Sequence, residues 1–87
     1  MEIMRVRSEL VASRRTPGLK NQSLRVLEDA KGGLAVACDP VGTPPGKYVF
    51  TVSGSAARLA TGDAKVLTDL TIAGIIDNWN PEETLRD

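Results

Sequence analysis

Glycine and proline divide this chain of 87 residues into short segments. The breaks fall at Pro17-Gly18, at Gly32-Gly33, between Pro40 and Gly46, and at Gly62. Proline lacks a backbone donor and glycine favours turns, so a long helix or strand is not expected to cross these positions. The remaining segments fit strands of roughly five to ten residues. A chain this short has one core, so we expect a single domain over residues 1–78, followed by a polar C-terminal tail over residues 79–87.

The apolar pattern assigns these segments to secondary structure. Apolar and polar side chains alternate over residues 4–13, which is typical of a half-buried strand. Further segments of strand character cover residues 23–29, 34–39, 48–52 and 70–76. The second and third strands flank a glycine turn and predict a hairpin. A short helix is expected over residues 53–60. The chain is therefore predicted to be all-β, a small five-stranded OB-like β-barrel with one short helix.

The core of such a barrel is thin and aliphatic. Aromatic residues make up 3% of the chain, and they are Tyr48, Phe50 and Trp79. Cys38 is the only cysteine and histidine is absent, so an intrachain disulfide is excluded and a zinc site is improbable. Small domains usually gain stability from disulfides, a metal or a partner subunit. Oligomerisation is the expected solution here, with no metal and no cofactor.

Cysteine usage and the first residues indicate the compartment. A free cysteine, expected to be buried in its strand, fits a reducing environment. The opening Met-Glu-Ile-Met-Arg-Val-Arg lacks the apolar region of a signal peptide. No segment approaches the ~20 consecutive apolar residues of a membrane helix. We expect a cytoplasmic protein without a membrane partner.

Two strands have apolar residues on both faces, which predicts contact between subunits. They are Leu34–Cys38 and Leu70–Ile76, whereas a surface strand of a monomer usually has one polar face. The outward residues are expected to be small, and a smooth apolar face is suited to packing against a neighbouring subunit. The predicted interface residues are Ala35, Ala37, Ala73 and Ile75.

The uneven distribution of charge along the chain is a second feature that bears on contact between subunits. The net charge is zero, but residues 1–25 carry +4 and residues 48–87 carry −3. Dilute charges of this sort usually belong to solvated loops. The alternative is that a basic segment of one subunit meets an acidic segment of the next.

Two segments resemble catalytic or nucleotide-binding motifs but lack the parts that the chemistry requires. Gly42 to Lys47 imitates a phosphate-binding loop, yet the spacing is one residue short, Tyr48 replaces the magnesium-binding hydroxyl, and a strand follows instead of a helix. Ser53-Gly54-Ser55 resembles a nucleophile elbow, but no histidine is available as a general base. We therefore predict no catalytic residues and no enzyme.

Nucleic-acid binding is an alternative for an OB-like barrel. Such binding uses a basic groove lined with aromatic rings. Here Tyr48 and Phe50 share one face of a strand and are expected in the core, which leaves Trp79. The neutral net charge also argues against it, although the loop with Arg14, Arg15 and Lys20 is basic. The alternative function is a cytoplasmic OB-like binding module for nucleic acid or protein.

Four stretches, in this order and spacing, resemble one protein family. They are Met-Glu-Ile-Met-Arg-Val-Arg at the start, Ala37-Cys-Asp-Pro-Val-Gly42, Val52-Ser-Gly-Ser-Ala-Ala-Arg58, and Asp69-Leu-Thr-Ile-Ala-Gly-Ile-Ile-Asp77 with Trp79 close behind. The chain resembles the pentameric vertex proteins of bacterial microcompartment shells. Within them it is most similar to those of the alpha-type carboxysome, and to the second of the two paralogues.

The resemblance implies a structural protein. Members of this family form five-fold rings that close the corners of a shell whose facets are hexameric shell proteins, and the enclosed chemistry is carbon dioxide fixation. The expected partners are other copies of this chain and those hexamers, in the carboxysome shell. The strand-to-helix turn is implied to border a narrow central pore, lined by Ser53, Gly54, Ser55 and Ala56. The two serines are expected to cap the helix or face the pore.

Overall fold

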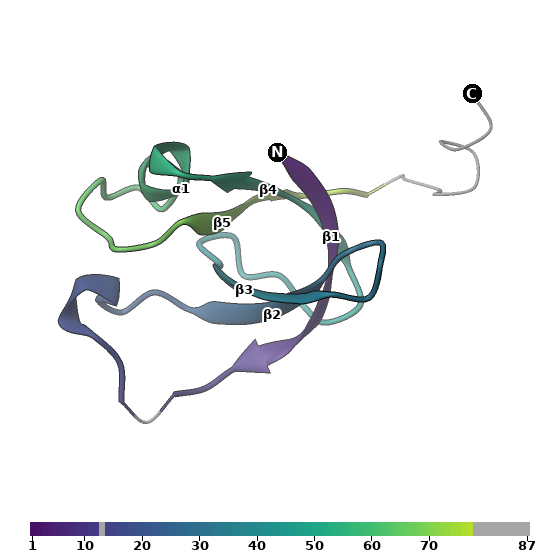
Figure 1. Ribbon diagram of the computed structural model, residues 1–87, viewed down its shortest axis with the longest axis horizontal. Helices are drawn as coiled ribbons and strands as arrows, with labels where there is room; N and C mark the ends of the chain where they lie inside the picture. The colour runs from purple at the N-terminus through teal and green to yellow at the C-terminus, as the bar shows by residue number, and fades with distance from the viewer. Residues whose placement is uncertain (13, 78–87) are drawn as a thin grey trace.

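The computed structural model describes residues 1–12 and 14–77, and this part of the chain forms a closed barrel (Figure 1). Its strands are β1 (Glu2–Leu10), β2 (Leu24–Glu28), β3 (Leu34–Cys38), β4 (Tyr48–Ser53) and β5 (Leu70–Ile75). Around the barrel they follow the order β1-β2-β3-β5-β4. A single turn of 3-10 helix, η1 (Pro17–Leu19), precedes β2, and the helix α1 (Ser55–Ala60) joins β4 to β5. The predicted five-stranded barrel with one short helix is confirmed. The first strand, predicted over residues 4–13, begins at Glu2 and ends at Leu10, so its predicted end was too late. The domain end at residue 78 and the tail with Trp79 lie outside the described residues.

Antiparallel pairing builds most of the barrel, and one parallel contact closes it. β1 pairs with β2 and β4, β2 pairs with β3, and β4 pairs with β5, all antiparallel. β3 and β5 are parallel, and their pairing is recorded only between Cys38 and Thr71. Each of β1 and β5 contains one extra residue, Arg7 and Ala73, where the register shifts. Such bulges bend and twist a strand, which helps a small sheet to close.

Two clusters of buried side chains fill the fold. The first occupies the barrel interior and consists of Met4, Val6, Leu27, Ala37, Val49 and Ile72. The second lies between the sheet and the loops and consists of Leu24, Cys38 and Val66. In the interior, the large side chain of Leu27 is opposite the small side chain of Ala35. The expected burial of Cys38 is confirmed.

Two polar contacts hold the loops to the barrel. The side chain of Asp39, which follows β3, is fully buried and pairs with Arg25 Nε at 3.2 Å. In the same loop Asp39 accepts hydrogen bonds from the backbone N–H groups of Val41, Gly42 and Thr43. On the other side, Lys20 after η1 pairs with Asp63 after α1. The loop from Pro40 to Gly46 is neither strand nor helix, as its composition predicts.

Candidate assembly site

The turn between β4 and α1 presents four small residues to solvent. Ser53, Gly54, Ser55 and Ala56 are all exposed, whereas Ala57 behind them is buried. Gly54 has φ of 64° and ψ of −144°, a backbone conformation that is open to glycine and strained for other residues. The chain can therefore leave the strand sharply and begin a helix at the next residue.

The expected role of the serines as helix caps is wrong. The N-cap residue is Gly54, which has no side chain to accept a hydrogen bond, and the helix begins at Ser55 instead of Ser53. Ser53 is still the last residue of β4. Neither serine hydroxyl has a hydrogen bond within residues 1–12 and 14–77. Both hydroxyls are free to meet solvent or a neighbouring molecule.

The outward residues of β3 are large, which corrects the prediction that they are small. Ala37 is buried in the barrel and Ala35 packs against the same cluster. Leu34 and Val36 face outward instead, with exposed fractions of 62% and 50%. The interior is closely packed, and the alanines of β3 lie in the same cluster as the large side chains of Leu27 and Ile72. An apolar outer face exists, but it is formed by the other residues of the strand.

β5 also differs from the expected pattern. Ile75 packs against the barrel interior, and Ala73 is the extra residue of the bulge and is half-buried. Ile75 is therefore not an outward residue of a regular strand, because the bulge at Ala73 shifts the alternation. The assignment of Ala73 and Ile75 to a subunit interface stays a prediction.

A second apolar area covers the outside of β1, β4 and β5. Ile3 is opposite Phe50, and Phe50 is opposite Gly74. The Phe50 ring lies over the glycine, since a Cβ at Gly74 would be 2.5 Å from Cε1 of the ring. The expectation that Tyr48 and Phe50 belong to the core is wrong, because Val49 and Thr51 are the buried residues of β4. The area around Ile3 and Phe50 is called the β1–β4 face below.

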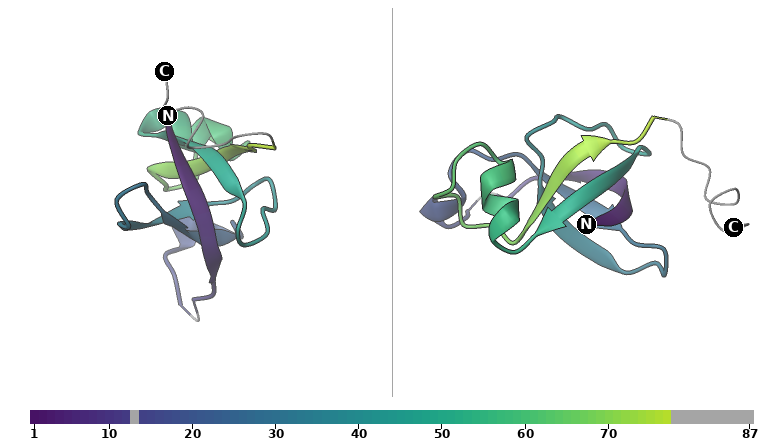
Figure 2. Two further views of the ribbon diagram at one scale, coloured as in Figure 1. Left: turned by 90° about the vertical axis from the view of Figure 1, so that its right-hand side faces the viewer. Right: turned by 90° about the horizontal axis from the view of Figure 1, so that it is seen from above.

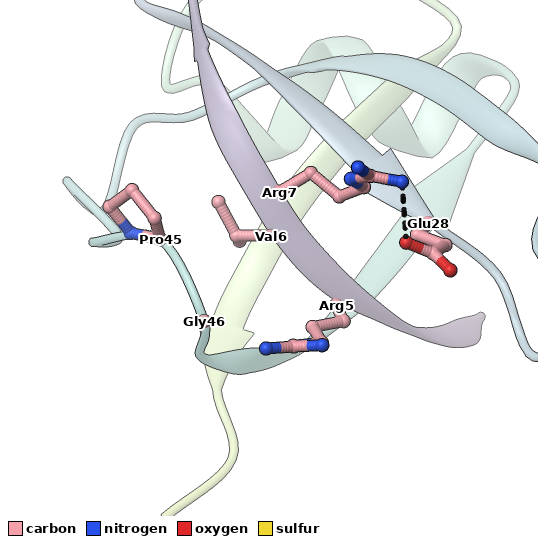
Figure 3. A pocket seen from close by; sticks show the side chains of 6 residues that line it. All are labelled: Arg5, Val6, Arg7, Glu28, Pro45 and Gly46. Carbon is pink, nitrogen blue, oxygen red and sulfur yellow. Dashed lines mark hydrogen bonds and ion pairs between the residues drawn. The ribbon is translucent and has the colours of Figure 1, made fainter.

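A hollow of about 520 Å³ lies beside this face, between β1 and the loop before β4. Figure 3 shows Arg7 reaching toward Glu28, and the two side chains form an ion pair of 3.1 Å. Arg5 extends the other way, toward Gly46 (Figure 3). In register Arg5 is opposite Glu28, but the bulge lets Arg7 take that carboxylate. Arg5 consequently has no hydrogen bond or ion pair among the described residues.

The described residues contain no metal-binding cluster, and the cations of their basic loop are partly engaged within the chain. No group of three or more His, Cys, Asp or Glu side chains is placed to hold a metal in this part of the chain. None of its helices is long and apolar enough to span a membrane. In the basic loop, Arg15 donates a hydrogen bond to the Lys20 carbonyl and Lys20 pairs with Asp63. Two of the three cations that could bind nucleic acid are thus engaged within the chain.

Comparison with known proteins identifies the family. A family model described as ethanolamine utilisation protein EutN/carboxysome matches residues 1–77. The chain belongs to this family. Within the EutN/carboxysome family, it is 68% identical over 79 residues to the carboxysome shell vertex protein CsoS4B of Halothiobacillus neapolitanus, covering 91% of this chain and 98% of the relative. It is 44% identical over 82 residues to the carboxysome shell vertex protein CsoS4A of Prochlorococcus marinus, covering 94% and 92%.

Solved structures of the family share the barrel. The structure of CsoS4B from Halothiobacillus neapolitanus matches with a TM-score of 0.85, covering 90% of this chain and 100% of that chain at 68% identity. CcmL of Gloeobacter violaceus matches with a TM-score of 0.79, covering 92% and 89% at 34% identity. A pentameric shell protein from the RMM microcompartment matches with a TM-score of 0.79, covering 93% and 99% at 26% identity.

Proposed function

We propose that this chain is a structural shell protein that forms homopentamers at the vertices of the alpha-type carboxysome shell, and so supports carbon dioxide fixation by the enclosed enzymes. The observation that carries the proposal is the 68% identity to a carboxysome shell vertex protein over nearly the whole of both chains. The exposed apolar side chains on two sides of the barrel support self-association. A closed icosahedral shell requires five-fold corners, which a ring of this kind supplies.

The turn at residues 53–56 borders the five-fold axis in this proposal. Five copies converge there, so small side chains are needed to avoid collision. Ser53, Gly54, Ser55 and Ala56 satisfy this condition, since all four are exposed and none is larger than serine. The hydroxyls of Ser53 and Ser55 have no hydrogen bond among the described residues, and in this proposal they form the polar rim of a narrow pore.

The proposed partners are other copies of the chain and the hexameric shell proteins of the facets, without nucleic acid or membrane. The protein has no catalytic activity in this proposal, and its place is the carboxysome shell in the cytoplasm. The contact with each hexamer can be weak, because it is repeated five times around a vertex.

Native mass spectrometry of the purified chain tests the proposal. A pentamer at micromolar concentration is the expected result, and a stable monomer or dimer contradicts it. Deleting the gene should leave shells with open corners or elongated bodies, and the wild-type chain should restore closed shells. The binding-module alternative predicts instead a salt-sensitive complex with an oligonucleotide.

A further inference from the structure

The outer edge of β3 is unpaired over most of its length within the described barrel. β3 pairs with β2 over its whole length, but its recorded pairing with β5 is confined to Cys38 and Thr71. In Figures 1 and 2 the turn of the β2–β3 hairpin projects beyond the other strands. The segment from Leu34 to Ala37 therefore has a partner strand on one side only, within the described residues.

The hydrogen-bond pattern of the hairpin shows which backbone groups face the open edge. Asp29 N–H donates to the Gly33 carbonyl at one end, and Asp39 N–H donates to the Ser23 carbonyl at the other. Hydrogen-bonded and non-hydrogen-bonded pairs alternate in an antiparallel ladder. Leu34 and Val36 fall in the non-hydrogen-bonded pairs, opposite Glu28 and Val26. Their N–H and carbonyl groups consequently point away from β2, toward the open edge.

The same two residues expose their side chains. Leu34 is 62% exposed and Val36 is 50% exposed. Natural proteins protect such edges with charges, proline or bulges, because an apolar strand with free backbone groups pairs with other chains. The sequence Leu-Ala-Val-Ala at residues 34–37 has none of these protections. A surface of this kind is expected to be covered in the functional state.

We propose that the edge of β3 at Leu34 and Val36 is covered by a neighbouring copy of this chain in the ring, on the β1–β4 face of that copy. This proposal rests on the proposed pentamer and names its subunit contact. A ring requires a heterologous contact, in which each subunit uses two different surfaces. In the strand order β1-β2-β3-β5-β4, the seam between β3 and β5 lies opposite β1. The two apolar surfaces thus occupy different sides of the barrel, as a ring requires.

Charge complementarity supports the same arrangement. Asp29 at the hairpin accepts hydrogen bonds from the N–H groups of Lys31 and Gly33, but it has no cationic partner in the described part of the chain. Arg5, beside the β1–β4 face, has no anionic partner there either. The proposed contact pairs the guanidinium of one copy with the carboxylate of the next. Arginine has five N–H donors, so Arg5 can also bind a free carbonyl of the β3 edge.

A second copy of this chain is a better occupant of the β3 edge than a facet protein, because a ring would cover the edge before any shell assembles. Ring formation covers the β3 edge of every subunit as soon as the ring closes. If only a facet protein covered it, each free ring would present five unprotected apolar edges until a shell assembled. Pairing of two β3 edges with each other is a two-fold contact and gives a dimer.

Val36→Arg and Val41→Arg form a matched pair for the experiment. Val41 is 46% exposed and lies in the loop after β3, so both variants place arginine at a similarly exposed valine. Native mass spectrometry of the full chain should show loss of the ring for Val36→Arg and an intact ring for Val41→Arg. Circular dichroism should show strand content unchanged in both. Equal loss of the ring in both variants, or an intact ring in Val36→Arg, overturns the proposal.

Amide hydrogen exchange gives a readout that does not depend on a variant of the edge itself. In the wild-type ring the amides of Leu34 and Val36 should exchange at least about tenfold more slowly than in monomers produced by Ile3→Arg. Exchange that is fast in the ring and slows only after a hexameric shell protein is added means that the facet covers the edge, which contradicts the proposal. A wild-type dimer contradicts it too.

The charge pair is tested by a double-mutant cycle. Arg5→Gln and Asp29→Asn each should raise the subunit concentration at which half of the rings dissociate by about two- to tenfold, and the double variant should match either single variant. Asparagine keeps the oxygen that accepts the turn hydrogen bonds. Independent effects of the two changes contradict this pairing. If the wild-type chain is monomeric, the proposed function itself fails; if it is a ring and these tests fail, only the assigned contact is wrong.

Discussion

Asp39 is the residue on which the loop after β3 depends. Its buried carboxylate binds three consecutive backbone N–H groups and the Thr43 hydroxyl. The Arg25 guanidinium, itself mostly buried, supplies the opposite charge. A buried charge is tolerated only with such partners.

We predict that Asp39→Ala lowers the free energy of unfolding by roughly 3 kcal/mol, because it leaves the mostly buried Arg25 without its counter-ion and the turn N–H groups without their acceptor. Urea unfolding at one fixed protein concentration measures the change. Asp69→Ala removes an exposed carboxylate that has no side-chain hydrogen bond in the described residues, and it should alter stability by less than about 0.5 kcal/mol. Similar losses in both variants argue against this role of Asp39.

Asp63 connects the loop after α1 to the loop before β2, and this contact depends on pH. The hydrogen bond from Lys20, followed by the Lys65 N–H, lowers the pKa of the Asp63 carboxyl. Because the pKa is lower in the folded than in the unfolded chain, the stabilisation is present above the unfolded pKa and is lost as pH falls through the folded pKa.

An NMR titration of the carboxyl groups should therefore show a pKa of Asp63 that rises toward its ordinary value in Lys20→Gln. Arg14→Gln changes a nearby cation of the same loop and should leave the pKa of Asp63 where it is. An unchanged pKa in Lys20→Gln shows that the pair does not form in solution.

At the scale of the elements, the exit from β4 depends on a single backbone conformation. Gly54 alone separates the last strand residue from the first helical residue, and its N–H donates to the Asp69 carbonyl. The turn thereby also fixes the start of β5.

Gly54→Ala should destabilise the subunit by about 1 to 3 kcal/mol, since its φ and ψ are costly for any residue with a Cβ. Ser55→Ala should cost less than about 0.5 kcal/mol, because the hydroxyl caps nothing within the subunit. Thermal unfolding followed by circular dichroism compares the two variants. A loss near 1 kcal/mol for Ser55→Ala would restore the capping role that the structure removes.

At the scale of the whole molecule, each substitution in the chain occurs five times in the proposed ring. Ser55→Arg places five like charges around the axis, and their repulsion is only partly screened over a Debye length of about 8 Å at physiological salt. The ring should loosen as salt is lowered, while Ser55→Ala stays pentameric. Analytical ultracentrifugation at two salt concentrations measures this. Rings of Ser55→Arg that are equally stable at both concentrations mean that the turn lies away from the axis.

The sequence alone predicted the strands, the hairpin and the five-stranded barrel. These features depend on local signals, since alternation specifies a strand and glycine or proline ends it. It also indicated a turn of small residues after the fourth strand, because glycine and serine are local signals too. That this turn borders a pore was implied only by the resemblance to the family and stays a proposal. The predicted start of the helix at Ser53 was wrong. The N-cap is Gly54, which has no side chain, so no capping side chain marks the start of the helix in the sequence.

Only the tertiary structure decided which face of β3 lies inside. In Leu34–Cys38 both faces are apolar, so the alternation could not choose between Ala35 with Ala37 and Leu34 with Val36. Closure of the barrel made the choice, because it places Leu27 of the neighbouring strand in the interior, where the small side chain of Ala35 packs beside it. The free edge of β3 likewise depends on how the strand pairs across the barrel with β5, a contact between residues far apart in the chain.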